Sequence, residues 1–230
     1  MKRRAALSSF VAAVLACSAL PPIASAADPS EFSPAERRLF VDDHLSALPR
    51  SATLEYAFAH RGSLEKPFDD TATLHVGPPH GTTGRSVKGT FLSATRRVDL
   101  PDLDGATGNP VILFFLEREV REMHRLTGGS ENYYRKRIRM ALANGAEVRD
   151  VEAAVGARRV PATEIRLAPY HDDPARSRYE RFAETTYVFT LSKDVPGAVV
   201  EMRSELRAPA DAAKPQPLVV ADVLRFSRIR

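Results

Sequence analysis

The chain of 230 residues contains no tryptophan and a single cysteine, Cys17. That cysteine lies within an apolar stretch from Ala5 to Leu20, which carries no charged residue. The rest of the chain therefore has no thiol, which excludes a disulfide, a thiolate metal site and a cysteine nucleophile there. Its stability must come from a packed core, and a chain of this length is enough for one domain with one core.

The first 26 residues have the form of an export signal. Met1 to Arg4 is a positively charged start, the apolar stretch follows, and Pro21-Pro22 precedes the small-residue cleavage pattern Ala24 to Ala26. The apolar stretch is shorter than the roughly twenty residues that cross a bilayer. We expect an exported, periplasmic protein cleaved after Ala26. As an alternative, Val14 to Cys17 resembles a lipobox, and the chain would be a lipoprotein anchored through Cys17.

Removal of this leader changes the charge of the protein. The full chain has 33 basic and 29 acidic residues, a net charge of +4, and the leader holds three basic residues and no acidic one. The mature chain then has 30 basic residues against 29 acidic ones, a net charge of +1. A balance this close to neutral removes the compositional argument for nucleic-acid binding. We expect residues 27–34 to be a flexible exit segment and residues 35–230 to form a single domain.

In the first part of that domain the spacing of apolar residues changes from that of a helix to that of strands. Ser33 to Glu36 has the form of a capped helix start with proline at the first helical position, and the helix is expected to end near Pro49. Apolar residues then alternate with others over Leu54 to Phe58 and over Thr71 to Val76, on either side of a turn at Gly62-Ser63. This alternation predicts an antiparallel hairpin.

Two more strands are predicted over Val87 to Val98 and over Pro110 to Leu116. The second is a continuous apolar run, which is typical of a strand covered on both faces. A helical pair follows, with one helix over Glu117 to Leu126, a break at Gly128-Gly129 and a second helix from Ser130 to Asn144.

Strands return after the helical pair. The predicted ones are Val160 to Leu167, Thr185 to Leu191, Ala198 to Leu206 and Leu218 to Ile229. The order of strands, helical pair and strands predicts an α+β fold. We expect a curved antiparallel, half-barrel-like sheet with an N-terminal helix and a mid-chain helical pair.

Three features together resemble the periplasmic half-barrel proteins of the bacterial envelope, the class that includes the lipoprotein carrier and receptor family. They are the export leader, the hairpin of Thr185 to Leu191 followed by Val195-Pro196-Gly197, and the mid-chain helical insertion. The resemblance covers the architecture of most of the mature chain and includes no diagnostic motif, so it assigns no binding residue. It implies a concave apolar surface that holds an acyl chain or a segment of a partner.

Basic residues gather on the predicted helical pair: Arg118, Arg121, Arg125, Arg135, Lys136, Arg137 and Arg139. Guanidinium groups pair well with phosphate, so this pair is a candidate for contact with phospholipid head groups at a membrane surface or with an acidic envelope protein. Glutamates are interleaved, however, and Glu117 lies four residues before Arg121. Mixed charge at this spacing is also typical of an ordinary solvated helix face.

The predicted ligand-binding residues lie at the start of the second helix: Tyr133, Tyr134, Arg135, Arg137 and Arg139. Tyrosine presents an apolar ring and a polar tip, so Tyr133 and Tyr134 can form an amphipathic lip beside the basic residues. Core packing is the alternative for Tyr134, whereas Tyr133 points in another direction around the helix.

Metal and cofactor signals are weak. His60, His75 and His80 approach one another only across the predicted hairpin, prolines intervene, and no His-x-x-x-His pattern lies on a helix. We predict no metal site and no cofactor. Ser63 and Lys66 have the spacing of a serine-lysine pair, but they lie in the predicted turn, where no helical turn brings them together.

Three hypotheses for the function remain. The one we choose is an exported, non-catalytic envelope protein that binds an apolar ligand, a lipid or acyl chain, or a protein segment in the curved sheet. The second is a secreted hydrolase with a histidine and carboxylate site assembled from loops, for which His44, His124 and His171 are the candidates. The third is a structural protein that binds a partner through the Arg-rich helical pair.

Overall fold

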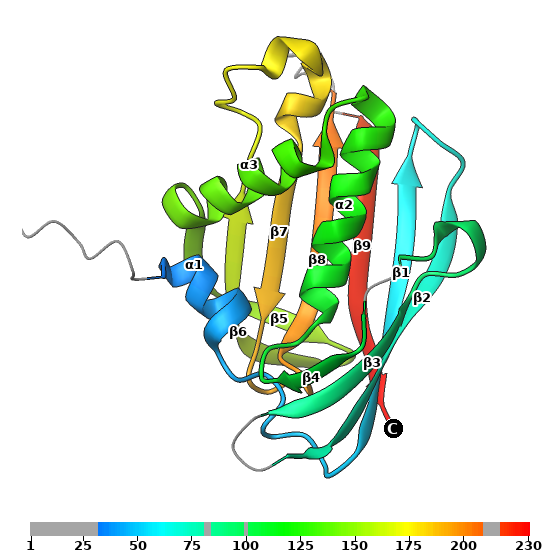
Figure 1. Ribbon diagram of the computed structural model, residues 1–230, viewed down its shortest axis with the longest axis vertical. Helices are drawn as coiled ribbons and strands as arrows, with labels where there is room; N and C mark the ends of the chain where they lie inside the picture. Colours follow the sequence, from blue (N-terminus) through cyan, green and yellow to red (C-terminus); the bar gives the residue numbers. More distant parts are fainter. Residues whose placement is uncertain (1–31, 81–83, 99–100, 209–216) are drawn as a thin grey trace, which may run out of the picture. The chain divides into compact units, whose positions relative to one another are not determined.

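The computed structural model describes residues 32–80, 84–98, 101–208 and 217–230 (Figure 1). In these residues nine antiparallel strands form one sheet in the order β4-β3-β2-β1-β9-β8-β7-β6-β5. The strands are β1 (Ala52–Gly62), β2 (Phe68–Pro79), β3 (Arg85–Phe91), β4 (Leu103–Ala106), β5 (Glu147–Val155), β6 (Arg158–Leu167), β7 (Thr186–Leu191), β8 (Val199–Arg207) and β9 (Leu218–Ile229). The sheet curves and does not close, which confirms the predicted half-barrel-like α+β fold.

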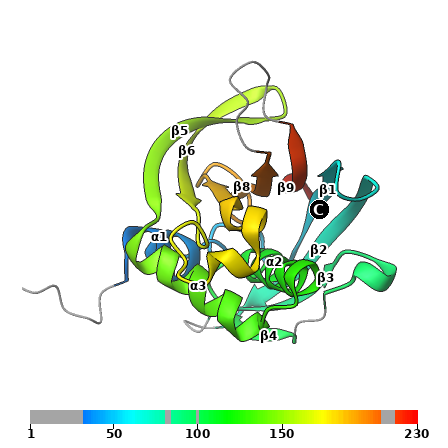
Figure 2. The same cartoon turned by 90° about the horizontal axis from the view of Figure 1, so that it is seen from above.

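The helices lie on the concave side of the sheet, whereas the β5–β6 hairpin bends away on the other side (Figure 2). They are α1 (Pro34–Glu36), which continues as the π-helical turn Arg37–Val41, α2 (Val111–Thr127) and α3 (Glu131–Asn144). Ser33 and Glu36 form a capping box at the start of α1, as the sequence predicts. The predicted end near Pro49 is wrong, because Asp42 takes an extended conformation and the helical segment stops at Val41. No helix in the described part of the chain has the length and apolar character needed to cross a membrane.

The predicted hairpin at the start of the domain is confirmed. Leu54 pairs with Leu74 and Tyr56 with Ala72 across β1 and β2, and all four side chains face the core. The last strand, β9, pairs with both β1 and β8, so it joins the strands that precede the helices to those that follow them. Residues far apart in the sequence thus meet in the middle of the sheet.

The strand predicted over Pro110 to Leu116 is wrong, because these residues begin α2. Asn109 Oδ1 accepts a hydrogen bond from the Val111 backbone N–H at 3.1 Å and so satisfies a free donor of the first turn. The apolar run is buried around almost the whole helix, with Leu113, 47% exposed, as the exception. A short apolar run has no periodicity that separates a buried helix from a buried strand.

Two strands escape prediction and one is shorter than expected. β5 is an edge strand that exposes most of its side chains, so its sequence carries little apolar alternation. β4 has only four residues. β3 ends at Phe91, not Val98, because Leu92 takes a left-handed conformation with φ of 60° and turns the chain.

The core fills the space between the concave face and α2. From the helix, Phe114 stacks on Phe91 with ring centroids 6.0 Å apart, and Phe115 meets Phe189 edge to face at 6.2 Å. The buried aromatic and aliphatic side chains of the sheet around them include Tyr56, Phe58, Leu74, Met202 and Leu224. Close packing of this kind leaves few voids, and α2 therefore occupies the concavity itself.

Candidate functional site

A row of polar side chains crosses the middle of the otherwise apolar concave face. His60 on β1 pairs in register with Asp222 on β9, and Asp222 pairs in register with Ser204 on β8. All three are buried, with exposures of 2 to 3%. They occupy inward positions of their strands, where the neighbouring inward residues are apolar, so the burial of polar groups here needs specific partners.

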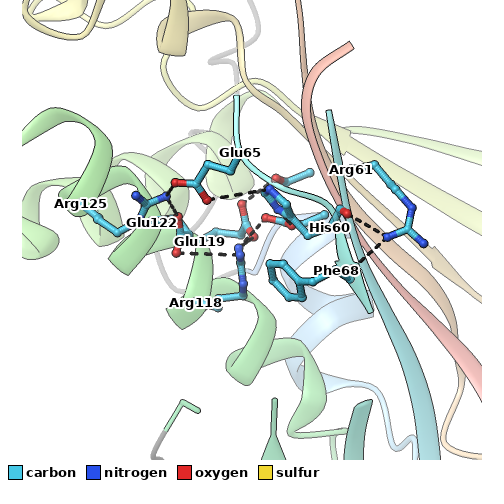
Figure 3. Close-up of polar contacts among 10 residues, drawn as sticks. His60, Arg61, Glu65, Phe68, Arg118, Glu119, Glu122 and Arg125 are labelled. Atoms are coloured by element: carbon cyan, nitrogen blue, oxygen red, sulfur yellow. Dashed lines mark hydrogen bonds and ion pairs between the residues drawn. The ribbon is translucent and has the colours of Figure 1, made fainter. Parts of the chain in front are cut away.

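Helix α2 supplies two of those partners, Arg118 and Glu119 (Figure 3). Arg118 Nη1 donates to Asp222 Oδ2 at 2.5 Å and to Glu119 Oε1 at 2.9 Å. Ser204 Oγ donates to Glu119 Oε2 at 2.6 Å. We call these five residues, His60, Arg118, Glu119, Ser204 and Asp222, the polar cluster. It ties the C-terminal half of α2, from Arg118 to Thr127, to strands β1, β8 and β9.

Three charged residues lie between the polar cluster and solvent, and we call them the rim. Arg125 Nη2 is 2.6 Å from Glu65 Oε1 and 2.7 Å from Glu122 Oε2. Their side chains are 26 to 48% exposed. A pocket with room for about 20 Å³ lies against the rim and the polar cluster. Its apolar lining is Leu64, Met123, Leu126, Phe182 and Val220.

His60 has one ring nitrogen engaged and one free of hydrogen bonds. Its Nδ1 lies 2.6 Å from Asp222 Oδ1, and its ring stacks on Phe68 with centroids 5.0 Å apart. Asp222 is held by Arg118, so its carboxylate accepts and Nδ1 carries the proton. Nε2 is buried without a hydrogen-bond partner among the described residues, and Glu65 Oε2 is 3.9 Å away. When the ring is neutral, this arrangement leaves Nε2 as an acceptor that lines the pocket.

Burial dominates the electrostatics of the polar cluster. Desolvation and, next, the charge of Asp222 raise the pKa of Glu119 to about 8, so this carboxyl group holds its proton at neutral pH. Burial acts to lower the pKa of Arg118, but the acidic groups around it, with the carboxylate of Asp222 first among them, outweigh burial and raise that pKa. The Arg118 guanidinium also lies 5.0 Å from the centre of the Phe58 ring. A charged arginine is therefore held inside an apolar face by several directed contacts.

The N-terminal half of α2, from Val111 to Glu117, starts at a different kind of anchor. Asn109 Nδ2 donates to Tyr56 Oη at 2.8 Å and to the Gly197 carbonyl at 2.6 Å. His44 Nδ1 accepts from the Asn109 backbone N–H at 3.0 Å, and His44 Nε2 lies 2.9 Å from the Arg38 carbonyl. One nitrogen accepts and the other donates, so His44 is neutral here, and burial lowers its pKa.

The predicted ligand-binding residues lie elsewhere, where α3 meets the segment before β7. Tyr134 is 1% exposed and packs edge to face on Tyr170 and Tyr179. Tyr133 Oη donates to Asp173 Oδ1 at 2.5 Å, and Arg137 Nε is 2.9 Å from Asp173 Oδ2.

The other arginines predicted there differ in their contacts. Arg135 pairs with Glu117 and Glu131, whereas Arg139 is exposed. The interleaved glutamates thus pair with arginines within the helical pair. The binding role of these residues stays a prediction.

The histidines nominated for acid–base chemistry do not line the pocket. His44 belongs to the Asn109 anchor, His124 Nδ1 lies 2.7 Å from the Gly129 carbonyl, and His171 Nδ1 pairs with Glu184 at 2.9 Å.

The structure also separates the histidines considered for a metal. His60 faces the core from β1, whereas His75 is on the outer face of β2, beside Thr53. No group of three or more potential metal ligands is found in the described residues.

The polar cluster is therefore the site that sequence reasoning missed. His60, Asp222 and Ser204 each stand at an inward position in an alternating strand, and this break in the apolar pattern was the available signal. It gave no hint that the three share a row, because the pairing of β9 with both β1 and β8 is a property of the topology.

Comparison with known proteins gives distant structural neighbours. No family model and no curated protein sequence matches the chain. Lipoprotein LppX of Mycobacterium tuberculosis is similar over 84% of this chain and 92% of its own, with 13% identity and a TM-score of 0.33. A LolA superfamily protein of Nitrosomonas europaea covers the same shares, with 7% identity and a TM-score of 0.24.

A third neighbour is an outer membrane lipoprotein-sorting protein domain of Vibrio parahaemolyticus. It is similar over 78% of this chain and 84% of its own, with 9% identity and a TM-score of 0.23. These neighbours belong to the class that the sequence resembles, so that resemblance is confirmed. With TM-scores this low, the likeness carries no inference about what this chain binds.

Proposed function

We propose that this chain is an exported envelope protein that binds an apolar ligand, a lipid or acyl chain, against the concave face of its sheet. The observation that carries the proposal is the way α2 covers that face. Helix α2 lies over the middle of the concave apolar surface, and its C-terminal half is held there by the charged groups of the polar cluster rather than by apolar contacts alone.

The ligand takes the place of the C-terminal half of α2. The pocket beside the polar cluster has room for about 20 Å³, about enough for one water molecule, whereas small-molecule sites occupy several hundred Å³. A ligand therefore enters only when this half of the helix moves away. Its tail then covers the apolar surface that Val120 and Met123 help to bury in the closed state.

Buried ion pairs suit a cover that must open. Two charges taken out of water gain little net stability, so separating the helix from the sheet and hydrating its charges costs less than exposing an equally large apolar contact. A ligand that supplies apolar surface offsets the remaining free-energy cost of moving the helix.

The test is binding of a fluorescent acyl probe to the protein purified from the periplasm of a bacterial host, with native mass spectrometry of the same sample. We expect saturable binding in a one-to-one complex. In the paired variant Arg118→Met with Asp222→Asn, an apolar contact replaces the ion pair, so α2 opens less readily and the probe should associate at least several-fold more slowly. Glu201→Gln, which removes an ion pair to Arg225 on the outer face of β8, is the matched control and should bind like the wild type. Absence of probe binding in all three folded proteins would contradict the proposal.

A second candidate function, hydrolysis, has one observation in its favour. A histidine oriented by a carboxylate at Nδ1, with Nε2 facing a pocket, has the arrangement of a general base. The hydroxyl in the same row, Ser204, donates to Glu119, so the attacking group would be water. Turnover of nitrophenyl acyl esters that is lost in His60→Gln would support this function, and equal rates in both proteins would remove it.

A further inference from the structure

We propose that the pocket beside His60 binds the head of the ligand and selects a primary ammonium group, so that the preferred ligand is a single-chain amphiphile with an amine head. The inference rests on the proposed function for the place of the tail, and it adds the chemical class of the head. It is carried by two properties of the part of the pocket that stays when α2 moves away: its free acceptor and its charge.

The free acceptor is His60 Nε2. It is buried, has no hydrogen-bond partner among the described residues, and is fixed in direction by Asp222 at Nδ1 and by the stacking of the ring on Phe68. A buried acceptor without a partner is unfavourable, and a donor placed against it removes that cost. An ammonium or hydroxyl group supplies the donor, whereas a carboxylate or phosphate offers only acceptors.

The charge of the pocket favours a cation. Of the acidic residues that line it, Glu65 and Asp222 lie outside α2 and stay in place when the helix moves away. In the closed state Arg125 pairs with Glu65 and Arg118 pairs with Asp222, and both arginines are on the half of α2 that moves. Movement of the helix leaves two carboxylates beside His60, which attract an ammonium group and repel an anionic head.

The two properties together separate an ammonium group from other heads. A trimethylammonium head is a cation without an N–H donor, and a hydroxyl head is a donor without a charge. The apolar lining outside α2, which includes Leu64, Phe182 and Val220, lies in position to contact the first methylene groups of the tail.

The test compares heads on one tail. Dodecylamine, dodecanol, dodecanoate and dodecyltrimethylammonium compete for the fluorescent acyl probe at pH 7, each below its micelle concentration. We expect dodecylamine to bind at least tenfold more tightly than dodecanoate or the trimethylammonium compound, with dodecanol between them. In His60→Phe, which keeps a ring to stack on Phe68, the preference for the amine over dodecanoate should fall at least fivefold. His75→Phe, on the outer face of β2, is the matched control and should keep the wild-type preference.

The outcomes test the selection of the head group and the binding of the tail separately. Equal affinity for all four compounds would overturn the head selection and leave the proposed function in place. A preference for dodecanoate would overturn it as well. Failure of every compound and of the probe to bind would overturn the proposed function. If His60→Phe does not fold, Glu65→Gln at the rim provides the second variant, because Glu65 is 37% exposed. Loss of a negative charge there should weaken the binding of dodecylamine and strengthen the binding of dodecanoate. An unchanged preference would count against the inference.

Discussion

The two halves of α2 are held to the same sheet by different kinds of contact. The N-terminal half begins at neutral hydrogen bonds around Asn109 and packs Phe114 and Phe115 into the core. The C-terminal half carries Arg118 and Glu119 into the polar cluster and ends near the rim. One half is held mainly by apolar packing, and the other is attached in part through charged groups that water can also solvate.

This difference shows how one helix can both complete a core and act as a cover. Aromatic packing loses its whole contribution when a helix moves into water, so the N-terminal half stays. Charged groups recover hydration when they separate, so the C-terminal half can leave at a smaller cost. Each substitution predicted below disrupts the contacts of one half of α2 and leaves those of the other half in place.

The largest effect is expected at Arg118. In Arg118→Met the carboxylate of Asp222 stays buried without its partner, and the free energy of unfolding should fall by about 3 to 5 kcal/mol. The paired variant Arg118→Met with Asp222→Asn should recover most of this loss, because no unpaired charge remains. Urea unfolding of the single and paired variants measures both values; a paired variant no more stable than Arg118→Met would show that the ion pair itself stabilises the fold.

The N-terminal anchor should respond next. Asn109→Ala removes the donors to Tyr56 and Gly197 and leaves the Val111 N–H without its acceptor, so the free energy of unfolding should fall by about 2 to 3 kcal/mol. Asn144→Ala, at the exposed end of α3, is the matched substitution and should change it by less than about 0.5 kcal/mol. Similar losses in the two variants would contradict the role of Asn109 as an anchor.

The two halves should also depend on pH in opposite directions. Glu119 has a pKa near 8 in the folded protein against 4.5 for the free side chain, so the folded state keeps a proton that the unfolded state loses, and stability falls as pH rises through this window. The slope reaches at most about 1.4 kcal/mol per pH unit. In Glu119→Gln this fall should be absent. Stability curves of both proteins between pH 5 and 8.5 provide the measurement.

His44 should affect the stability of the fold at lower pH than Glu119 does. Its folded pKa is below the ordinary value of 6.5, so below pH 6.5 the unfolded state binds a proton that the folded state does not, and stability falls as the pH decreases. His44→Gln offers an amide that can both donate and accept, and it should flatten this acid limb. An unchanged acid limb in the variant would show that His44 is not the group responsible.

The smallest effect is expected at the rim. Arg125 is 48% exposed and pairs with Glu65 and Glu122 in contact with water, so Arg125→Ala should change the free energy of unfolding by at most about 0.5 to 1 kcal/mol. High salt should reduce even this difference. A loss as large as that of Arg118→Met would mean that the rim is part of the buried cluster.

Much of the fold could be predicted from the sequence, because the spacing of apolar residues and the residues that cap helices or form turns act locally. The alternation around Tyr56, the capping box at Ser33 and the break at Gly128, which ends α2 with a φ of +72°, all gave correct elements. The apolar run after Pro110 was assigned to a strand, since burial on all sides removes the period that distinguishes a helix.

The candidate site could not be predicted, because its residues meet only through topology. His60 and Asp222 are 162 positions apart, and they become neighbours when the last strand inserts beside the first. Local sequence patterns favour Tyr133 and the arginines near it, which the structure places in contacts with Asp173, Glu117 and Glu131. Inward polar residues on three strands were a weak signal without the strand order.

The most direct test measures whether the C-terminal half of α2 leaves the sheet when ligand binds. The mature chain expected from the sequence has no cysteine, so pairs of spin labels can be placed at Ala57→Cys on the exposed face of β1 and at either Leu113→Cys or Arg121→Cys on α2. On addition of dodecylamine, the distance from Ala57 to Arg121 should increase by several ångströms, whereas the distance from Ala57 to Leu113 should not change. Binding of the amphiphile with both distances unchanged would contradict the claim that α2 is the cover.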